Sequence, residues 1–302
     1  MNKRGTLVVI TGATGVGKTD TSIKVSQAID APIVSCDSRQ IFKEMRIGTA
    51  VPSDEQLAAA EHHFIRCRSI FEPYNCGQYE KEAIELIDKL LQRHSHVILT
   101  GGSGLYIDAV TRGFDPIPPA DDNVRTMLAA KLEREGLASL SEMLARLDPD
   151  YAGLVDHHNR QRIMRALEVC LTTGRPYSSL RKGESRERNF VPLFILIDRP
   201  RAELYRRIDQ RVDAMISEGL VDEARGLHPF SHLNALRTVG YSELFDHFDG
   251  LCDLDTAIEL IKRNSRRYAK RQLTWFRRNP EYKTFSPDDT EQIIAYITSH
   301  KQ

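Results

Sequence analysis

The chain has 302 residues, enough for one large domain or two. Its hydrophobic share of 41% and charged share of 28% are ordinary for a globular protein and exclude a disordered or fibrous one. Its 42 basic and 42 acidic side chains cancel, so only local clusters of charge can indicate a polyanionic partner.

The beginning of the chain has a basic start, but its first apolar run is too short for a signal peptide. No run of 18 apolar residues occurs anywhere in the sequence, which argues against a membrane partner. The five cysteines are odd in number and form no CxxC pair, so neither a disulfide framework nor a zinc site is indicated. We therefore expect a cytoplasmic protein.

The first predicted elements are an apolar strand at residues 7–10, a loop, and an amphipathic helix that extends to Ile29. The loop matches the P-loop pattern G-x-x-x-x-G-K-T, and its backbone N–H groups and helix dipole suit phosphate oxygens. We expect Lys18 to reach the terminal phosphates and the Thr19 hydroxyl to ligate Mg²⁺. The alternative is a glycine-rich turn that only connects strand to helix. The predicted phosphate site comprises Gly12, Ala13, Thr14, Gly15, Val16, Gly17, Lys18 and Thr19.

Two further buried-type strands follow, at residues 32–34 and 96–100, with a helical stretch near 79–92 between them. This alternation predicts an α/β fold with a parallel sheet and helices on both faces. Because the ends of parallel strands line up at one edge, residues that follow different strands become neighbours. The expected neighbours are Thr11, Asp37 and Gly101.

Asp37 is the acid at a strand end near the predicted phosphate site, since the strand 96–100 ends in Thr-Gly-Gly. In the NTPase template a second strand ends in an acid that holds Mg²⁺. Here the acid is followed by Ser38, Arg39 and Gln40, which favours a polar reaction centre over a simple metal ligand. The alternative is an aspartate that caps a following helix.

The pattern changes after residue 113. A proline-rich breaker at 116–119 precedes a helical region from 121 to about 173, and a polar linker leads to another core strand at 191–197. We interpret residues 114–189 as a helical insertion in a sheet domain formed by residues 1–113 and 190–302.

Basic side chains gather in two helical segments of the C-terminal part. Residues 206–220 combine an apolar stripe with Arg207 and Arg211 on another face. Residues 262–278 contain eight basic residues and no acid, so the face should repel itself and favour nucleic-acid phosphates over a solvated helix. These eight are Lys262, Arg263, Arg266, Arg267, Lys270, Arg271, Arg277 and Arg278. In the insertion, the segment 159–165 offers Gln161 and several arginines for reading bases as well as backbone.

In order along the chain, these motifs resemble one family, the tRNA dimethylallyltransferases (tRNA isopentenyltransferases) of bacterial type. The resemblance covers nearly the whole length and implies a P-loop, kinase-like core with a helical insertion. It is carried by the segments GATGVGKT (12–19), DSRQ (37–40), IGTA (47–50), GGSGLY (101–106), NRQRIMRALEV (159–169), TGRP (173–176), TVGY (238–241) and KRQLTW (270–275).

The resemblance implies an activity. Members transfer a dimethylallyl group from dimethylallyl diphosphate to the exocyclic N6 amine of the adenosine 3′-adjacent to the anticodon, in tRNAs that read codons beginning with U, and release diphosphate. The implied partners are the tRNA anticodon stem-loop and dimethylallyl diphosphate, with Mg²⁺ as cofactor, and we expect a monomer. The zinc-finger tail of some eukaryotic members is missing from the sequence.

The resemblance also implies roles for individual residues. Asp37 is expected to accept the proton of the amine, Ser103 to keep the hydroxyl where the family usually has threonine, and Arg211 to neutralise charge on the departing diphosphate together with the loop. Thr19 is the expected Mg²⁺ ligand. The implied tRNA-binding residues are Asp37, Ser38, Arg39, Gln40, Ser103, Arg125, Gln161, Arg162, Ile163, Met164, Arg165, Lys270 and Arg271.

Three other functions compete with this one. A small-molecule kinase accounts for the P-loop but leaves the insertion and the basic helix unexplained. A nucleotide-gated RNA-binding protein accounts for the basic helix but gives Asp37 no task. An isopentenyltransferase acting on free adenylate needs neither the insertion nor the basic helix.

Overall fold

A computed structural model describes residues 4–115, 117–118, 121–183 and 185–300 of the chain. The chain divides into two compact units. Unit 1 comprises residues 1–111 and 188–302, and unit 2 comprises residues 112–187, nearly the limits predicted for the insertion. Among the described residues, no helix is long and apolar enough to cross a membrane.

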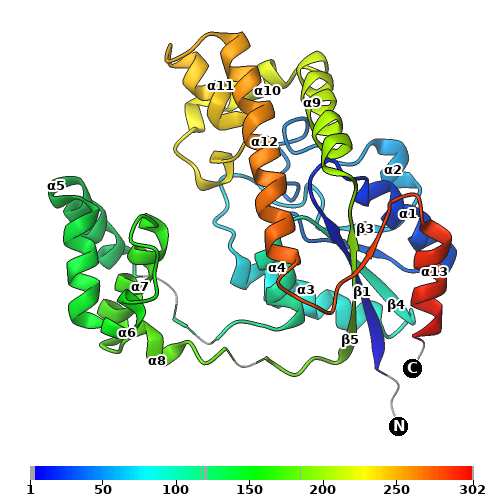
Figure 1. The fold of residues 1–302 in the computed structure, drawn as a ribbon, viewed down its shortest axis with the longest axis horizontal. Helices are drawn as coiled ribbons and strands as arrows, with labels where there is room; N and C mark the ends of the chain where they lie inside the picture. Colours follow the sequence, from blue (N-terminus) through cyan, green and yellow to red (C-terminus); the bar gives the residue numbers. More distant parts are fainter. Residues whose placement is uncertain (1–3, 116, 119–120, 184, 301–302) are drawn as a thin grey trace. The chain divides into compact units, whose positions relative to one another are not determined.

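Unit 1 is built on a parallel sheet, as the alternating pattern predicted (Figure 1). Its order in the described chain is β3-β2-β4-β1-β5-β6, and every neighbouring pair is parallel. The sequence did not predict the edge strands β3 and β6, which are too short to carry a pattern. The strands are β1 (Gly5–Gly12), β2 (Ile33–Ser35), β3 (His62–His63), β4 (His96–Gly101), β5 (Phe190–Ile197) and β6 (Lys283–Phe285).

Helices cover both faces of this sheet, so its central strands are buried on both sides and read as continuous apolar runs. One face packs against α3 and α4, and the other against α1, α9 and α13, with α1 and α13 side by side (Figure 1). The helices of unit 1 are α1 (Lys18–Ile29), α2 (Asp54–Ala58), α3 (Cys76–Leu90), α4 (Gly104–Thr111), α9 (Arg201–Ser217), α10 (Leu220–Leu227), α11 (Tyr241–Phe248), α12 (Leu254–Phe276) and α13 (Thr290–Ser299), with short 3₁₀ turns at His228–Phe230 and Asn234–Leu236.

Helix α12 connects the parts of unit 1. Its N-terminus is capped by Asp253, whose carboxylate accepts a hydrogen bond from the Thr256 N–H at 2.7 Å. Along its length it places Ile261 in a cluster with α9, α10 and α11, Ala269 under one sheet face and Phe276 under the other. The predicted apolar stripe of α9 is likewise buried, so both basic segments are amphipathic helices.

Unit 2 is helical, as predicted. Its helices are α5 (Asp122–Leu147), α6 (Pro149–Ala152), α7 (Arg160–Thr173) and α8 (Tyr177–Leu180). Helix α5 is kinked at Gly136, and α7 ends at Gly174 in the left-handed conformation (φ 67°), where the sequence predicted a stop. Pro116 and Pro119 of the predicted breaker lie outside the described residues.

Candidate active site

The ends of β1, β2 and β4 meet beside the phosphate loop. The Thr11 hydroxyl donates to the Gly101 carbonyl at 2.8 Å. A β-carbon at Gly101 would lie 2.7 Å from Cys36 Sγ and 3.0 Å from the Asp37 nitrogen, so only glycine fits between these strands. The predicted neighbourhood of Thr11, Asp37 and Gly101 is therefore confirmed.

The phosphate loop, residues 12–19, presents unpaired backbone donors. Gly15 and Gly17 have φ values of 77° and 110°, which side chains other than glycine rarely adopt. In the part of the chain that the structure describes, the N–H groups of Gly15, Gly17, Lys18 and Thr19 have no acceptor. Such donors at the start of a helix form an anion-binding nest.

Two cations stand in front of these donors. The Lys18 ammonium donates to the Ala13 carbonyl at 2.7 Å and lines the same pocket as Arg211. Burial lowers the pKa of Lys18 to about 8, the Arg211 charge acts in the same direction, and the Asp37 carboxylate opposes both. Burial also lowers the pKa of Arg211, which has no acid within ion-pair distance among the described residues. Two close cations without an acid partner favour a multiply charged anion.

The two oxygens of the Asp37 carboxylate have different surroundings. Its Oδ1 accepts hydrogen bonds from the N–H groups of Arg39 and Gln40, at 2.9 and 3.2 Å. Its Oδ2 has no donor in the described chain, and the side chain lines the pocket that contains Lys18 and Arg211. The helix-capping alternative is wrong, because a turn and not a helix follows Asp37. One carboxylate oxygen holds this turn while the other is open to a substrate.

Ser103 lies at the same strand edge. Its hydroxyl accepts a hydrogen bond from the Ser38 N–H at 3.0 Å and lies 3.2 Å from the Ser38 hydroxyl. The nearby Tyr268 lines the pocket, and burial together with the Asp37 charge raises its pKa to about 12, so its phenol stays protonated. Gln40, by contrast, is occupied internally, because its amide donates to the carbonyls of Thr49 and Ala50.

Arg211 joins three adjoining hollows into one site within unit 1. The polar end contains the phosphate loop and the middle contains Asp37. The far end has a largely apolar wall formed by Ile208, Val212, Met215, Val239 and Ile261. One pocket therefore offers an anion site, a carboxylate and an apolar wall.

Two residues that hold this site together were not identified as functional from the sequence. Gln272 of α12 accepts a hydrogen bond from the Thr14 N–H at 2.9 Å and donates to the Gly102 carbonyl at 2.9 Å. Glu223 of α10 accepts hydrogen bonds from the three N–H groups of residues 46–48 and from the Tyr241 hydroxyl. Gln272 lies within the quoted motif 270–275, whereas no quoted motif contains Glu223.

The basic face of α12 needs a correction. The absence of acids within residues 262–278 does not leave all of its charges repelling one another, because acids of other elements pair with three of them. Lys262 contacts Asp213, and Arg277 contacts Asp198 at 2.7 Å. Arg266 pairs with Asp209. In the described chain, the exposed residues without an acid partner include Arg263, Arg267, Lys270 and Arg271.

The predicted RNA-binding residues of unit 2 differ in their exposure and in their internal contacts. Gln161 and Arg162 are exposed, whereas Ile163 is completely buried in the core of the unit, which excludes a side-chain contact with RNA. Met164 is half-buried against the same core. Arg125 and Arg165 both contact Glu168, at 2.9 and 3.5 Å.

No cluster of His, Cys, Asp or Glu suited to a metal ion occurs among the described residues. The Thr19 hydroxyl has no hydrogen-bond partner within that same part of the chain, and it lines the pocket in front of the loop. One protein oxygen fits Mg²⁺, which commonly takes its remaining ligands from water and substrate phosphates.

Residues 40–279 match the model of the IPP transferase family. The chain is 50% identical to the tRNA dimethylallyltransferase of Flavobacterium johnsoniae, over 97% of each chain, and 49% identical to that of Christiangramia forsetii, also over 97% of each. Its structure is similar to the tRNA isopentenylpyrophosphate transferase of Bacillus halodurans (34% identity, TM-score 0.72, 98% of this chain and 96% of the other). It is also similar to a eukaryotic dimethylallyltransferase acting on tRNA (25% identity, TM-score 0.77, 95% and 75%).

Proposed function

The chain belongs to the IPP transferase family, and from this premise we propose that it is a tRNA dimethylallyltransferase. Its substrates are dimethylallyl diphosphate and a tRNA anticodon stem-loop, and the acceptor is the N6 amine of the adenosine 3′-adjacent to the anticodon, in tRNAs that read codons beginning with U. The observation that carries this proposal is the free oxygen of Asp37 in the same pocket as Lys18 and Arg211.

The transfer requires three coupled changes. A bond forms between N6 and the allylic carbon, the bond from that carbon to the diphosphate oxygen breaks with its electron pair, and N6 loses a proton. Asp37 accepts the proton through Oδ2, a step that is needed because the lone pair of the amine is delocalised into the base. The absence of a donor to Oδ2 among the described residues supports this role. Lys18, Arg211 and the free N–H groups of the loop stabilise the negative charge that develops on the diphosphate.

The other parts of the site fit the two substrates. The apolar wall suits the hydrocarbon part of the donor. The hydroxyl of Tyr268, which interacts with that of Ser103 and lines the pocket beside Asp37, is available to hydrogen-bond the acceptor base. Thr19 would hold Mg²⁺ together with the diphosphate, and when bound the ion neutralises charge on the leaving group. The exposed arginines of α12 and of unit 2 supply attraction for RNA phosphates. We expect the enzyme to act as a monomer in the cytoplasm, where unmodified tRNA is available.

The decisive experiment incubates the protein with dimethylallyl diphosphate, Mg²⁺ and an unmodified tRNA that reads codons beginning with U. We expect one prenylated adenosine next to the anticodon, detected by mass spectrometry of nuclease fragments. Free AMP serves as the competing acceptor and ATP as the competing donor. Prenylation of AMP without tRNA modification, or phosphate transfer from ATP, would refute the proposal.

A further inference from the structure

Two arginines bind consecutive carbonyls of the phosphate loop. Arg199 Nε donates to the Val16 carbonyl at 3.0 Å, and Arg207 Nε donates to the Gly15 carbonyl at 3.0 Å. Arg207 also lines the pocket in front of the loop, so it can act on a ligand directly. Arg199 lines none of the three hollows of the active site.

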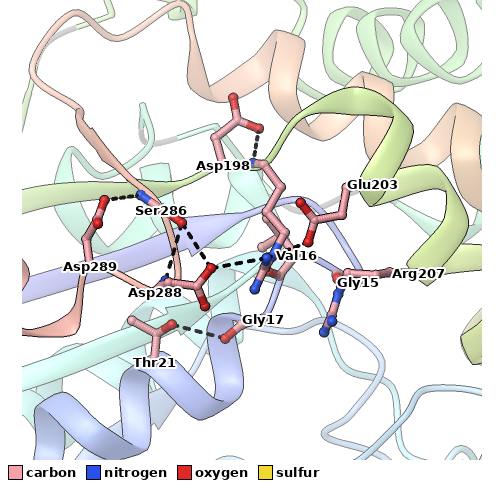
Figure 2. A network of polar contacts seen from close by, with 11 residues as sticks. Gly15, Val16, Gly17, Thr21, Asp198, Glu203, Arg207, Ser286, Asp288 and Asp289 are labelled. Carbon is pink, nitrogen blue, oxygen red and sulfur yellow. Dashed lines mark hydrogen bonds and ion pairs between the residues drawn. The ribbon is translucent and has the colours of Figure 1, made fainter.

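Arg199 is fixed where it stands. Its side chain is only 13% exposed, and its NH1 contacts the Glu203 carboxylate at 2.5 Å and the Asp288 carboxylate at 3.4 Å. These two carboxylates and the Val16 carbonyl all accept hydrogen bonds from the Arg199 guanidinium. Figure 2 shows Glu203, Asp288 and Val16 close together, with Gly15 and Arg207 beside them. Three acceptors thus hold one guanidinium in a single orientation.

This hydrogen bond has a consequence on the other side of the peptide plane. The Val16 carbonyl and the Gly17 N–H belong to one trans peptide unit, so they point in opposite directions. Fixing the carbonyl outward directs the Gly17 N–H inward, and this N–H is one of the unpaired donors of the loop. Because glycine tolerates many conformations, this peptide plane is free to rotate unless a contact fixes it.

Arg199 affects the phosphate site less through its charge than through its hydrogen bond to the loop. Two carboxylates stand within ion-pair distance of it, so its field at the phosphate site is largely cancelled. Arg211 differs, because it faces the pocket and has no acid partner within the described residues. The structure therefore separates a cation that attracts the anion from one that orients the loop.

The segment after β6 completes the support. A β-carbon at Gly17 would lie 3.3 Å from Pro287, which places residues 286–289 against the back of the loop. Asp289 accepts a hydrogen bond from the Ser286 N–H at 2.9 Å, and this turn holds Asp288 toward Arg199. The C-terminal part of unit 1 is thereby connected to the phosphate loop.

We propose that Arg199, anchored by Glu203 and Asp288, is a positioning residue that turns the Gly17 N–H toward the diphosphate. This proposal rests on the proposed function only for the identity of the organic group that is attached to the diphosphate. It predicts that disturbing Arg199 weakens diphosphate binding and leaves the tRNA interaction unchanged.

The test measures binding of inorganic pyrophosphate with Mg²⁺ by calorimetry on the full chain, together with the KM for each substrate. Arg199→Met should weaken pyrophosphate binding roughly tenfold, as expected for losing one oriented charge-assisted hydrogen bond, and should raise the KM for dimethylallyl diphosphate but not for tRNA. Arg201→Met is the matched control, because it removes an equal charge only two residues from Arg199. The Arg201 side chain stacks on the Tyr205 ring. This variant should bind pyrophosphate normally.

Glu203→Gln gives the sharpest result, since it makes the surroundings of the loop more positive while loosening Arg199. Positioning predicts weaker pyrophosphate binding, whereas direct attraction by charge predicts tighter binding. Tighter binding, or normal affinity in a folded Arg199→Met, overturns the proposal. If Arg199→Met does not fold, Glu203→Gln and Arg199→Lys decide, with a loss expected in both. A wild-type protein that binds pyrophosphate in this pattern but modifies no tRNA would refute the proposed function and leave this inference standing.

Discussion

The phosphate loop and the exposed face of α12 are both positively charged, yet they are built differently. At the loop, Lys18 and Arg211 of α9 are half-buried and line the same hollow as Gly15, Gly17 and Thr19, whose N–H groups have no acceptor among the described residues. On α12, Arg263, Arg267, Lys270 and Arg271 are exposed, and no described acid pairs with them. A preorganised site gives each group a large and specific effect, whereas a dispersed surface gives each group a small effect that salt screens.

The largest effect is expected at Asp37. Asp37→Asn keeps an oxygen that can accept the hydrogen bonds from Arg39 and Gln40, so the turn should survive while the proton acceptor is lost. We expect kcat for tRNA prenylation to fall by about 10²–10⁴, with pyrophosphate affinity preserved. Single-turnover kinetics and calorimetry measure the two quantities. A variant with near-normal turnover would remove Asp37 from the role of base.

The control for this substitution is Asp30→Asn, because Asp30 is an exposed acid at the C-terminal end of α1 that lines none of the three hollows of the site. It removes the same charge without touching the strand edge where β1, β2 and β4 meet. Turnover of this variant should stay within about twofold of the wild type, as is usual for an exposed charge.

The second prediction concerns the pH dependence of pyrophosphate binding. Lys18 is charged below its pKa of about 8 and loses its proton above it, whereas a bound anion favours the charged form. Affinity should therefore be constant below pH 8 and fall above it, by up to about tenfold per pH unit. In the Lys18→Arg variant the side chain stays charged over this pH range, while pyrophosphate itself titrates as it does with the wild type. The fall in affinity that is due to Lys18 should therefore be missing in this variant. Equal slopes in both proteins would assign the pH dependence to the ligand.

Features of the fold and of the site that depend on a local sequence pattern could be predicted from the sequence. The loop was predicted because a phosphate nest needs glycines, a lysine and a hydroxyl at fixed spacing on a strand–helix junction. Asp37 was predicted because it is an acid that directly follows a neighbouring strand. The parallel sheet followed from apolar runs that are buried on both faces. The strand His62–His63 was missed, since two residues carry no period.

Partners distant in sequence could not be predicted. Arg266 looks unpaired in the sequence because the acid that pairs with it, Asp209, belongs to α9. Lys262 pairs with Asp213 of α9 and also with Glu259, three residues before it on α12. The link from Gln272 to the Thr14 N–H spans 258 positions. Ile163 stands among polar residues of a quoted motif, and only the packing of unit 2 shows that its side chain points into the core.

The third prediction tests the dispersed surface. Neutralising Arg263, Arg267, Lys270 and Arg271 together should weaken tRNA binding at least about tenfold and reduce the salt slope by about 3, as expected for roughly 0.7 per RNA phosphate that is no longer neutralised. Filter binding at several salt concentrations measures both. Lys262→Gln combined with Asp213→Asn is the matched control, since it removes a paired cation without changing the net charge. An unchanged slope in the fourfold variant would make this face an ordinary solvated helix.

The smallest effects are expected in unit 2, where they separate an arginine free for RNA from one used internally. Arg162 is exposed, so Arg162→Ala should weaken tRNA binding about two- to threefold without changing the melting temperature. Arg125 pairs with Glu168, whose side chain is only 5% exposed, so Arg125→Ala leaves a nearly buried carboxylate short of a partner and should lower the melting temperature by about 2–4 °C. Arg125→Ala together with Glu168→Gln should recover part of that loss, because the uncompensated charge is gone. If Arg125→Ala weakened tRNA binding more than Arg162→Ala and the double variant did not restore it, Arg125 would be an RNA contact despite its internal partner, as the family resemblance implied.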